Sequence, residues 1–243
     1  LNQNKMQFYY PADFTQFLFQ NGAAYYREDG AYSGLDSAEA YQGFKECAEL
    51  FINYGVPVSA NFFSRFRTGE MPMGLGKYAD YQLLSVGAPE LMGRWGIAPL
   101  PGTRTADGQV DRSHGGIAGQ CAVIMSNSEK KEQAWQFLRW WTETDVQLQF
   151  ANEIEAMIGV EARWNTANLE AFDAIPWGDA DLAVFHEQWK WAKEVPIVPG
   201  GYFTSRHLTN AWNRIVINGQ PVRMALEEAV ADINRELLMQ REE

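Results

Sequence analysis

Apolar residues recur at helical spacing along most of this sequence, whereas apolar runs that could form strands are few and short. The clearest helical stretch has apolar side chains at steps of one, three, four and three residues, at Ala40, Tyr41, Phe44, Ala48 and Phe51. Ser37 precedes this stretch as a capping residue and Gly55 follows it, so we predict a capped amphipathic helix. Similar patterns predict further helices over residues 61–67, 78–86 and 179–193, after Ser126, from Thr144, at residues 200–206 and after Gly219.

Three short apolar runs are the candidate strands, at residues 71–76, 95–98 and 117–125. Residues 99–102 (PLPG) form a stiff crossover, and residues 103–116 are polar and contain glycine, which predicts a loop. Residues 154–164 lose their periodicity, so we expect a connection there. Ser126 and Glu129 have the spacing of a capping box for the helix that follows. Together these patterns predict a helix-rich α/β fold.

Length and charge narrow the function classes. The 243 residues suffice for one large domain or two small ones. A net charge of −11 repels phosphate backbones and anionic lipids, so we expect no nucleic acid partner.

Cys47 and Cys121 are far apart in apolar stretches, so we expect two buried thiols and no disulfide framework. We find neither a membrane-spanning apolar run nor a signal peptide after Leu1, so targeting gives no location.

Motifs of several enzyme classes are absent from the sequence. It has no phosphate-binding glycine motif of the GxGxxG or GxxxxGK[ST] type, no GxSxG and no HExxH. His114, His186 and His207 lack metal-like spacing, so we expect no metal and no cofactor. A carboxylate pair for glycoside hydrolysis could still be assembled by the tertiary fold, although Glu153 and Glu155 point in different directions locally. A glycan-active hydrolase domain is therefore an alternative.

Aromatic residues gather beside polar ones at the ends of three predicted elements. One group surrounds Pro11 and Asp13, a second follows the glycine turn at residues 74–76, and a third occupies residues 200–206 (GGYFTSR). A polyhydroxylated ligand needs such groups, because a ring covers the apolar face of a sugar while polar side chains bind its hydroxyls. The same rings could instead fill corners between helices, and a helical interaction domain without a small ligand is favoured if they point to different faces.

The order of several short motifs resembles the carbohydrate-binding (maltose-binding-like, family 1) extracellular solute-binding proteins that serve ABC importers. The motifs are residues 66–73 (FRTGEMPM), 95–102 (WGIAPLPG), 115–117 (GGI), 126–138 (SNSEKKEQAWQFL) and 218–226 (NGQPVRMAL). Taken in order, the resemblance spans residues 6–238. It implies a type II periplasmic-binding-protein fold, no catalytic activity, and an extracellular, cell-surface lipoprotein or periplasmic location.

The resemblance also implies that this chain is the C-terminal portion of such a receptor. Residues 1–98 and 155–243 would form the second lobe, and residues 103–150 would be a crossover segment that belongs to the first lobe. The N-terminal first lobe would be largely absent, so the missing lobe of the same parent chain is an expected partner. The permease subunits of an ABC transporter are another. In the family a carbohydrate binds between the lobes, which close by hinge bending.

By resemblance, seven residues would form the second-lobe wall of the ligand site. Aromatic stacking would come from Tyr10, Phe14, Tyr78 and Tyr202, and hydroxyl contacts from Asp13 and Arg206, with Lys77 beside them. The planar guanidinium of an arginine can donate hydrogen bonds to two hydroxyls at once. The sequence does not identify the sugar or the oligomeric state.

Overall fold

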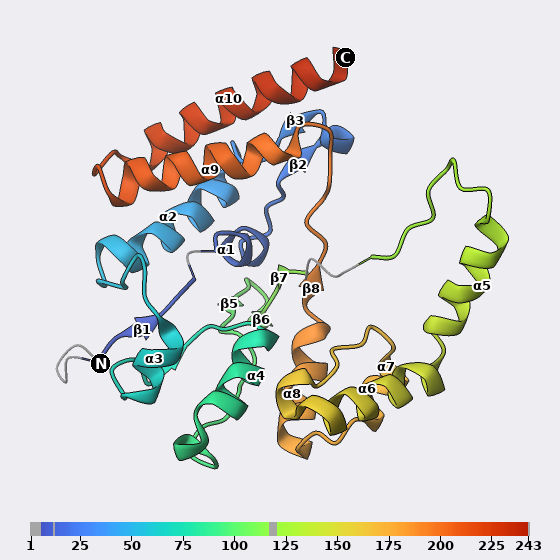
Figure 1. Cartoon of the computed structure of the whole chain (residues 1–243). Helices are drawn as coiled ribbons and strands as arrows, with labels where there is room; N and C mark the ends of the chain where they lie inside the picture. The colour runs from blue at the N-terminus through green and yellow to red at the C-terminus, as the bar shows by residue number, and fades with distance from the viewer. Residues whose placement is uncertain (1–5, 12, 117–120, 243) are drawn as a thin grey trace. The chain divides into compact units, whose positions relative to one another are not determined.

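A computed structural model of the chain describes residues 6–11, 13–116 and 121–242. The chain divides into two compact units (Figure 1). Unit 1 comprises residues 1–75, 99–117 and 188–243, and unit 2 comprises residues 76–98 and 118–187. None of the described helices is long and apolar enough to cross a membrane.

The body of unit 1 is a group of packed helices: α1 (Thr15–Gln20), α2 (Ala38–Ile52), α9 (Gly201–Val216) and α10 (Val222–Glu242). α9 and α10 lie side by side, and α2 packs against both of them and against α1 (Figure 1). The predicted cap of α2 is confirmed, because the Ser37 hydroxyl accepts a hydrogen bond from the Ala40 N–H at 3.1 Å. Ala40, Phe44, Ala48 and Phe51 of the predicted apolar stripe are buried in the core.

Gly43 allows α1 and α2 to approach closely. A Cβ atom at this position would lie 2.8 Å from the backbone oxygen of Phe17, a distance that real Cβ atoms do not show. α9 packs against the same helix α2 and contributes the buried residues Ala211 and Ile215 to this core. Glycine is therefore required at position 43 by the packing of two helices rather than by its own backbone angles.

Short strands flank these helices. β1 (Phe8–Tyr9) pairs in parallel with β4 (Met73–Gly74), and β7 (His114–Gly115) pairs in parallel with β8 (Ala192–Lys193). β2 (Tyr26–Arg27) and β3 (Tyr32–Ser33) form an antiparallel pair around the 3₁₀ turn η2 (Glu28–Gly30). Unit 1 also contains α3 (Phe62–Arg67), which is capped by the side chain of Asn61. The helix-rich α/β class is thus confirmed.

Unit 2 is helical. It contains α4 (Tyr78–Gly87), η3 (Pro89–Leu91), α5 (Lys131–Trp141), α6 (Thr144–Ile158), η4 (Val160–Ala162), α7 (Leu169–Ala174) and most of α8 (Asp179–Trp189). Five rings pack together with centroid distances of 4.8 to 6.3 Å; we call Tyr78, Tyr81, Phe172, Trp177 and Phe185 the aromatic cluster. This cluster gives unit 2 its own apolar centre.

The predicted loop at residues 103–116 is in part a hairpin. β5 (Thr103–Arg104) pairs with β6 (Val110–Asp111), and the Thr105 N–H donates to the Gln109 oxygen at 2.9 Å across a turn in which Gly108 has φ of +84°. The loop prediction was wrong here because the polar residues of a hairpin tip hide the strands on either side.

Two predicted strands are not found among the residues that the structure describes. Residues 95–98 form no strand, and they pair with none of the described strands. For the run at 117–125, residues 117–120 lie outside the described residues, and residues 121–125 form no strand. Cys121 is exposed, which corrects the expectation of two buried thiols, whereas Cys47 is buried as expected. An apolar run becomes a strand only where the fold supplies a partner.

Three helix boundaries also differ from the prediction. α5 begins at Lys131 without a side-chain cap, so the capping box from Ser126 is wrong; the Ser128 hydroxyl instead accepts from the Lys130 N–H at 3.2 Å. α6 continues through residues 154–158, where we expected a connection. α8 ends at Trp189 because the chain then enters β8, which pairs with β7. Tertiary pairing overrides local helical spacing in this last case.

The compact units differ from the predicted segments 1–98, 103–150 and 155–243. Residues 76–98 group with residues 118–187 in unit 2, and residues 99–117 group with unit 1. The assignment of segments to a first and a second lobe remains a prediction, because it refers to a lobe outside this sequence.

Candidate functional site

The loop between β1 and α1 carries three of the predicted site residues. Tyr10 and Phe14 are core residues with only 3% and 8% of their surface exposed. The Tyr10 hydroxyl donates to the backbone oxygen of Asp13 at 2.5 Å, and burial raises the Tyr10 pKa far above its usual value. The Phe14 ring packs edge-on against Phe44 and Tyr25. Both rings are enclosed by protein, so in this structure they support the loop and present no open face for stacking.

Asp13 is exposed at the start of α1. One of its carboxylate oxygens accepts a hydrogen bond from the Thr15 N–H at 2.9 Å, an interaction that favours an acidic residue at a helix start. The position of the carboxylate is therefore fixed by the beginning of the helix. Its second oxygen accepts no hydrogen bond from the described residues and can bind a hydroxyl.

The start of α9 presents the next two predicted residues on one face of the helix. Tyr202 is 76% exposed and Arg206 is also exposed. Residues four apart stand on the same face of a helix, so Tyr202 and Arg206 occupy neighbouring positions on one face of α9. The ring of Phe203 lies 5.6 Å from the Tyr202 ring and 5.7 Å from the Arg206 guanidinium, so it contacts both side chains.

A tyrosine pair joins the Asp13 loop to the start of α9. Tyr25 and Thr15 share a hydrogen bond between their hydroxyls at 2.7 Å, and the Tyr26 hydroxyl donates to the Thr204 hydroxyl at 3.0 Å. The two tyrosine rings lie 6.2 Å apart. Burial raises the pKa of Tyr25 to about 12, so its hydroxyl stays protonated at neutral pH. Sequence reasoning missed this pair, although two consecutive tyrosines were the visible signal.

Lys77 and Tyr78 belong to unit 2, at the start of α4. The Lys77 backbone N–H donates to the Asp80 carboxylate at 2.7 Å, and Lys77 is exposed. The Tyr78 hydroxyl donates to the backbone oxygen of Arg163 at 3.3 Å, and its half-buried ring belongs to the aromatic cluster. Burial raises the Tyr78 pKa well above its ordinary value.

Arg163 is a residue that sequence reasoning missed. Its guanidinium lies over the Trp177 ring at 5.0 Å and makes two hydrogen bonds to the Glu155 carboxylate, at 2.8 and 2.6 Å. The region had no periodicity in the sequence, and no local pattern marks a contact between residues of different elements. The arrangement holds the aromatic cluster against α6.

The histidines offer no metal site in the described part of the chain. There, no group of three or more His, Cys, Asp or Glu side chains is arranged to hold a metal ion. His114 is half-buried and its Nδ1 lies 2.9 Å from the Gln188 amide nitrogen; burial lowers its pKa. His186 pairs with Asp173 at 2.7 Å. These contacts are structural links between elements.

Comparison with known protein families decides the class of this molecule. The family model described as bacterial extracellular solute-binding protein matches residues 10–148, more than half of the chain. The chain belongs to this family. The matched stretch includes Asp13, Lys77 and Tyr78, and it ends before α9.

Solved structures of solute-binding proteins share the fold. The sugar-binding protein MalE from Xanthomonas citri matches with a TM-score of 0.75 and 22% identity over 98% of this chain and 60% of its own. A solute-binding protein from Thermotoga lettingae bound with α-D-tagatose gives 0.69 and 18% over 98% and 61%. MalE from Listeria monocytogenes in complex with maltose gives 0.70 and 16% over 97% and 61%.

The chain spans about three-fifths of the length of these structures. No curated protein sequence matches it at a significant level. The solute-binding family that the motifs resembled is confirmed, and members of that family are binding proteins rather than enzymes. The hydrolase alternative finds no support in these comparisons.

Proposed function

We propose that this solute-binding protein captures a carbohydrate, an oligosaccharide, for an ABC importer. The observation that carries the proposal is the start of α9, where Tyr202 and Arg206 are both exposed and stand four residues apart, about one helical turn. An aromatic ring can cover the apolar C–H face of a sugar, and a guanidinium can donate two hydrogen bonds to adjacent hydroxyls. The sugars named with two of the matched structures support this ligand class.

Asp13 would supply the acceptor for this site. Its carboxylate is fixed by the Thr15 N–H, and the tyrosine pair connects its loop to α9 within unit 1. An arginine that donates and a carboxylate that accepts would together orient the hydroxyls of one sugar ring, since each hydroxyl both donates and accepts. Tyr10 and Phe14 would act in this site as packing residues beneath the loop.

Lys77 and Tyr78 of unit 2 are the other two residues that we propose to contact the ligand. The exposed lysine can donate to a hydroxyl, and the ring of Tyr78 is only half-buried. Both residues lie within the stretch that matches the family model.

The rest of the receptor is part of the same proposal. The first lobe of the parent protein, to which residues 103–150 would belong, would close over the sugar by hinge bending, and the closed form would dock on the permease subunits. The receptor would act outside the cytoplasmic membrane, in the periplasm or as a cell-surface lipoprotein.

Calorimetric titration of the full-length parent with a panel of oligosaccharides tests the assignment of residues. For the sugar that binds, Tyr202→Ala and Arg206→Met should each raise Kd about tenfold or more, because each removes a contact to the ligand without touching the core. Tyr54→Ala is the matched control, since Tyr54 is another exposed tyrosine of unit 1. Unchanged affinity in both site variants would remove α9 from the ligand site.

Tyr78→Ala should also weaken binding. Its ring packs in the aromatic cluster, so thermal unfolding of this variant has to be measured in parallel. A variant that folds and binds as tightly as the natural protein would remove Tyr78 from the site.

A further inference from the structure

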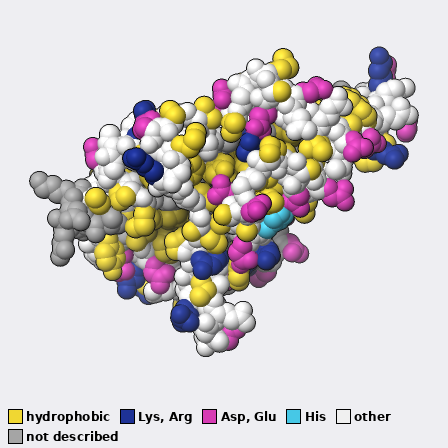
Figure 2. Space-filling model, turned by 90° about the horizontal axis from the view of Figure 1, so that it is seen from below, with side chains coloured by type: hydrophobic (Ala, Val, Ile, Leu, Met, Phe, Trp, Pro, Cys, Tyr) yellow, Lys and Arg dark blue, Asp and Glu magenta, His cyan; other side chains and the backbone are white. Residues whose placement is uncertain are grey.

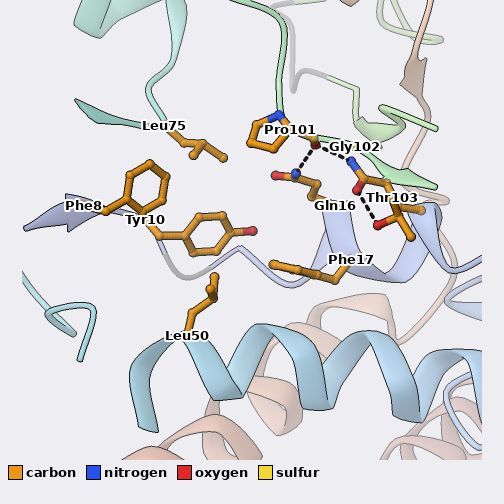
Figure 3. Close-up of a pocket in the computed structure, with 10 residues that line it drawn as sticks. Phe8, Tyr10, Gln16, Phe17, Leu50, Leu75, Pro101, Gly102 and Thr103 are labelled. Atoms are coloured by element: carbon orange, nitrogen blue, oxygen red, sulfur yellow. Dashed lines mark hydrogen bonds between the residues drawn. The ribbon is translucent and has the colours of Figure 1, made fainter. Parts of the chain in front are cut away.

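A pocket of about 190 Å³ lies inside unit 1, between the ends of β1 and β4 and helices α1 and α2 (Figure 3). Its walls are mostly apolar: Phe8, Tyr10, Phe17, Leu50, Leu75, Pro101 and Gly102, with Gln16, Gln20 and Thr103 as the polar members. Several of the apolar residues are only half-buried, so the pocket is reached from solvent. It shares only Tyr10 with the proposed sugar site.

The polar side chains of the pocket are held in place by hydrogen bonds. The Gln16 amide donates to the Pro101 oxygen at 3.0 Å, and the Gln20 amide donates to the same oxygen at 3.1 Å and to the Ser113 oxygen at 3.2 Å. The Thr103 hydroxyl donates to the Gln20 side-chain oxygen at 3.0 Å. After these bonds, the side-chain oxygen of Gln16 has no donor among the described residues, and it faces the pocket in Figure 3.

Tyr10 offers a second acceptor. Its hydroxyl hydrogen is donated to the Asp13 backbone oxygen, so only the lone pairs of the phenol oxygen remain for another partner. The hydroxyl points into the pocket toward Gln16 in Figure 3. The pocket therefore presents acceptors and no charged side chain, because its lining contains no Lys, Arg, Asp, Glu or His.

We infer that this pocket binds an uncharged single-ring compound that carries one hydroxyl, of the class of phenol. An apolar cavity of about 150 Å³ accommodates benzene, so 190 Å³ accepts one ring with a substituent. The hydroxyl would donate to Gln16. A charged ligand would be desolvated without a counter-charge, and a sugar would leave most of its hydroxyls unpaired against apolar walls. The site is thus independent of the proposed carbohydrate function.

Phenol and toluene are the probes for this site, since they differ by one donor. Titration of the isotope-labelled chain, followed by two-dimensional amide NMR, should give saturable shifts at the pocket residues. Phenol should bind roughly fivefold more tightly than toluene, the ratio expected for one neutral hydrogen bond. In Gln16→Met, which keeps the side-chain length and removes this acceptor, the preference for phenol should fall, because only the Tyr10 oxygen remains. Glucose should leave the pocket amides unshifted.

Leu50→Phe tests the location by filling the pocket, and it should weaken both probes at least tenfold. Ile52→Phe is the matched control on the same helix, because Ile52 is exposed and outside the pocket. If Leu50→Phe fails to fold, Leu75→Phe replaces it. The inference is overturned if neither probe gives saturable shifts, if a folded filled variant binds like the natural chain, or if Gln16→Met keeps the full preference for phenol.

Discussion

At the scale of single residues, the ion pair between Glu155 and Arg163 gives a prediction with a definite sign. Both side chains are largely shielded, and the two hydrogen bonds from the guanidinium hold the pKa of the Glu155 carboxyl below its ordinary value. The charged carboxylate therefore stabilises the fold above the unfolded-state pKa of about 4.3, and this contribution is lost as the pH falls through the lower folded-state pKa. Glu155→Gln should lower the free energy of unfolding by about 2 kcal/mol at pH 7 and by much less at pH 3.

Urea denaturation at the two pH values measures this difference. Glu153→Gln is the matched control, since Glu153 is an exposed carboxylate on the same helix and, among the described residues, accepts only from Gln149. An equal loss of stability at both pH values for Glu155→Gln would show that the charge of this carboxylate does not stabilise unit 2.

The predicted ligand-binding residues mark the limit of sequence reasoning about the site. The exposure of Asp13, Tyr202 and Arg206 could be predicted from the sequence because each stands at the end of an element, where exposure is common. Tyr10 and Phe14 have the same local signature and are nevertheless buried, because α2 supplies Phe44 and Phe51 as partners for their rings. Burial depends on a distant helix, so a local pattern cannot reveal it.

At the scale of elements, the contact between α1 and α2 depends on Gly43. Alanine is normally the better helix former by about 1 kcal/mol, so Gly43→Ala would stabilise an isolated helix. Here the new methyl group would meet the backbone of Phe17, which cannot move aside as a side chain can. We expect a net loss of about 2 kcal/mol in the free energy of unfolding, measured by urea denaturation.

Gly96→Ala is the control for this substitution, because no atom lies within 4 Å of the added group. Equal stability of Gly43→Ala and the natural chain would mean that α1 and α2 are not closely packed at this point.

The elements themselves were predictable to different degrees. α2, α3, α4 and α10 follow from apolar spacing, caps and the proline at residue 221, which are all local signals. The paired strands are two residues long, so their hydrogen bonds come from partners that spacing does not encode. Helix boundaries failed where a strand pair or a turn competed with the helical pattern, as at the end of α8.

At the scale of the whole molecule, large apolar side chains remain at the surface of both units. Figure 2 shows hydrophobic side chains spread over the face that it presents. On α5, Trp135 and Trp140 are 56% and 49% exposed. This helix lies in the segment that we assign to the first lobe. The chain covers about three-fifths of the solved structures that it matches. If the rest of the parent protein covers α5, these rings are interface residues there.

Replacing both tryptophans with glutamate tests that assignment. In this chain the double variant should change the free energy of unfolding by less than about 1 kcal/mol, as exposed positions usually do. In the full-length parent the same change should cost several kcal/mol, because it would bury charge in the lobe interface. Equal effects in the two proteins, measured by chemical denaturation, would contradict the proposed place of α5.

The most direct test of the carbohydrate receptor is the stoichiometry of sugar binding by the unmodified full-length parent. Isothermal titration with a panel of neutral oligosaccharides should give at least one saturable isotherm with one site per molecule. It should do so without release of free sugar products. Failure of every oligosaccharide to bind, with the protein shown to be folded, would contradict the account.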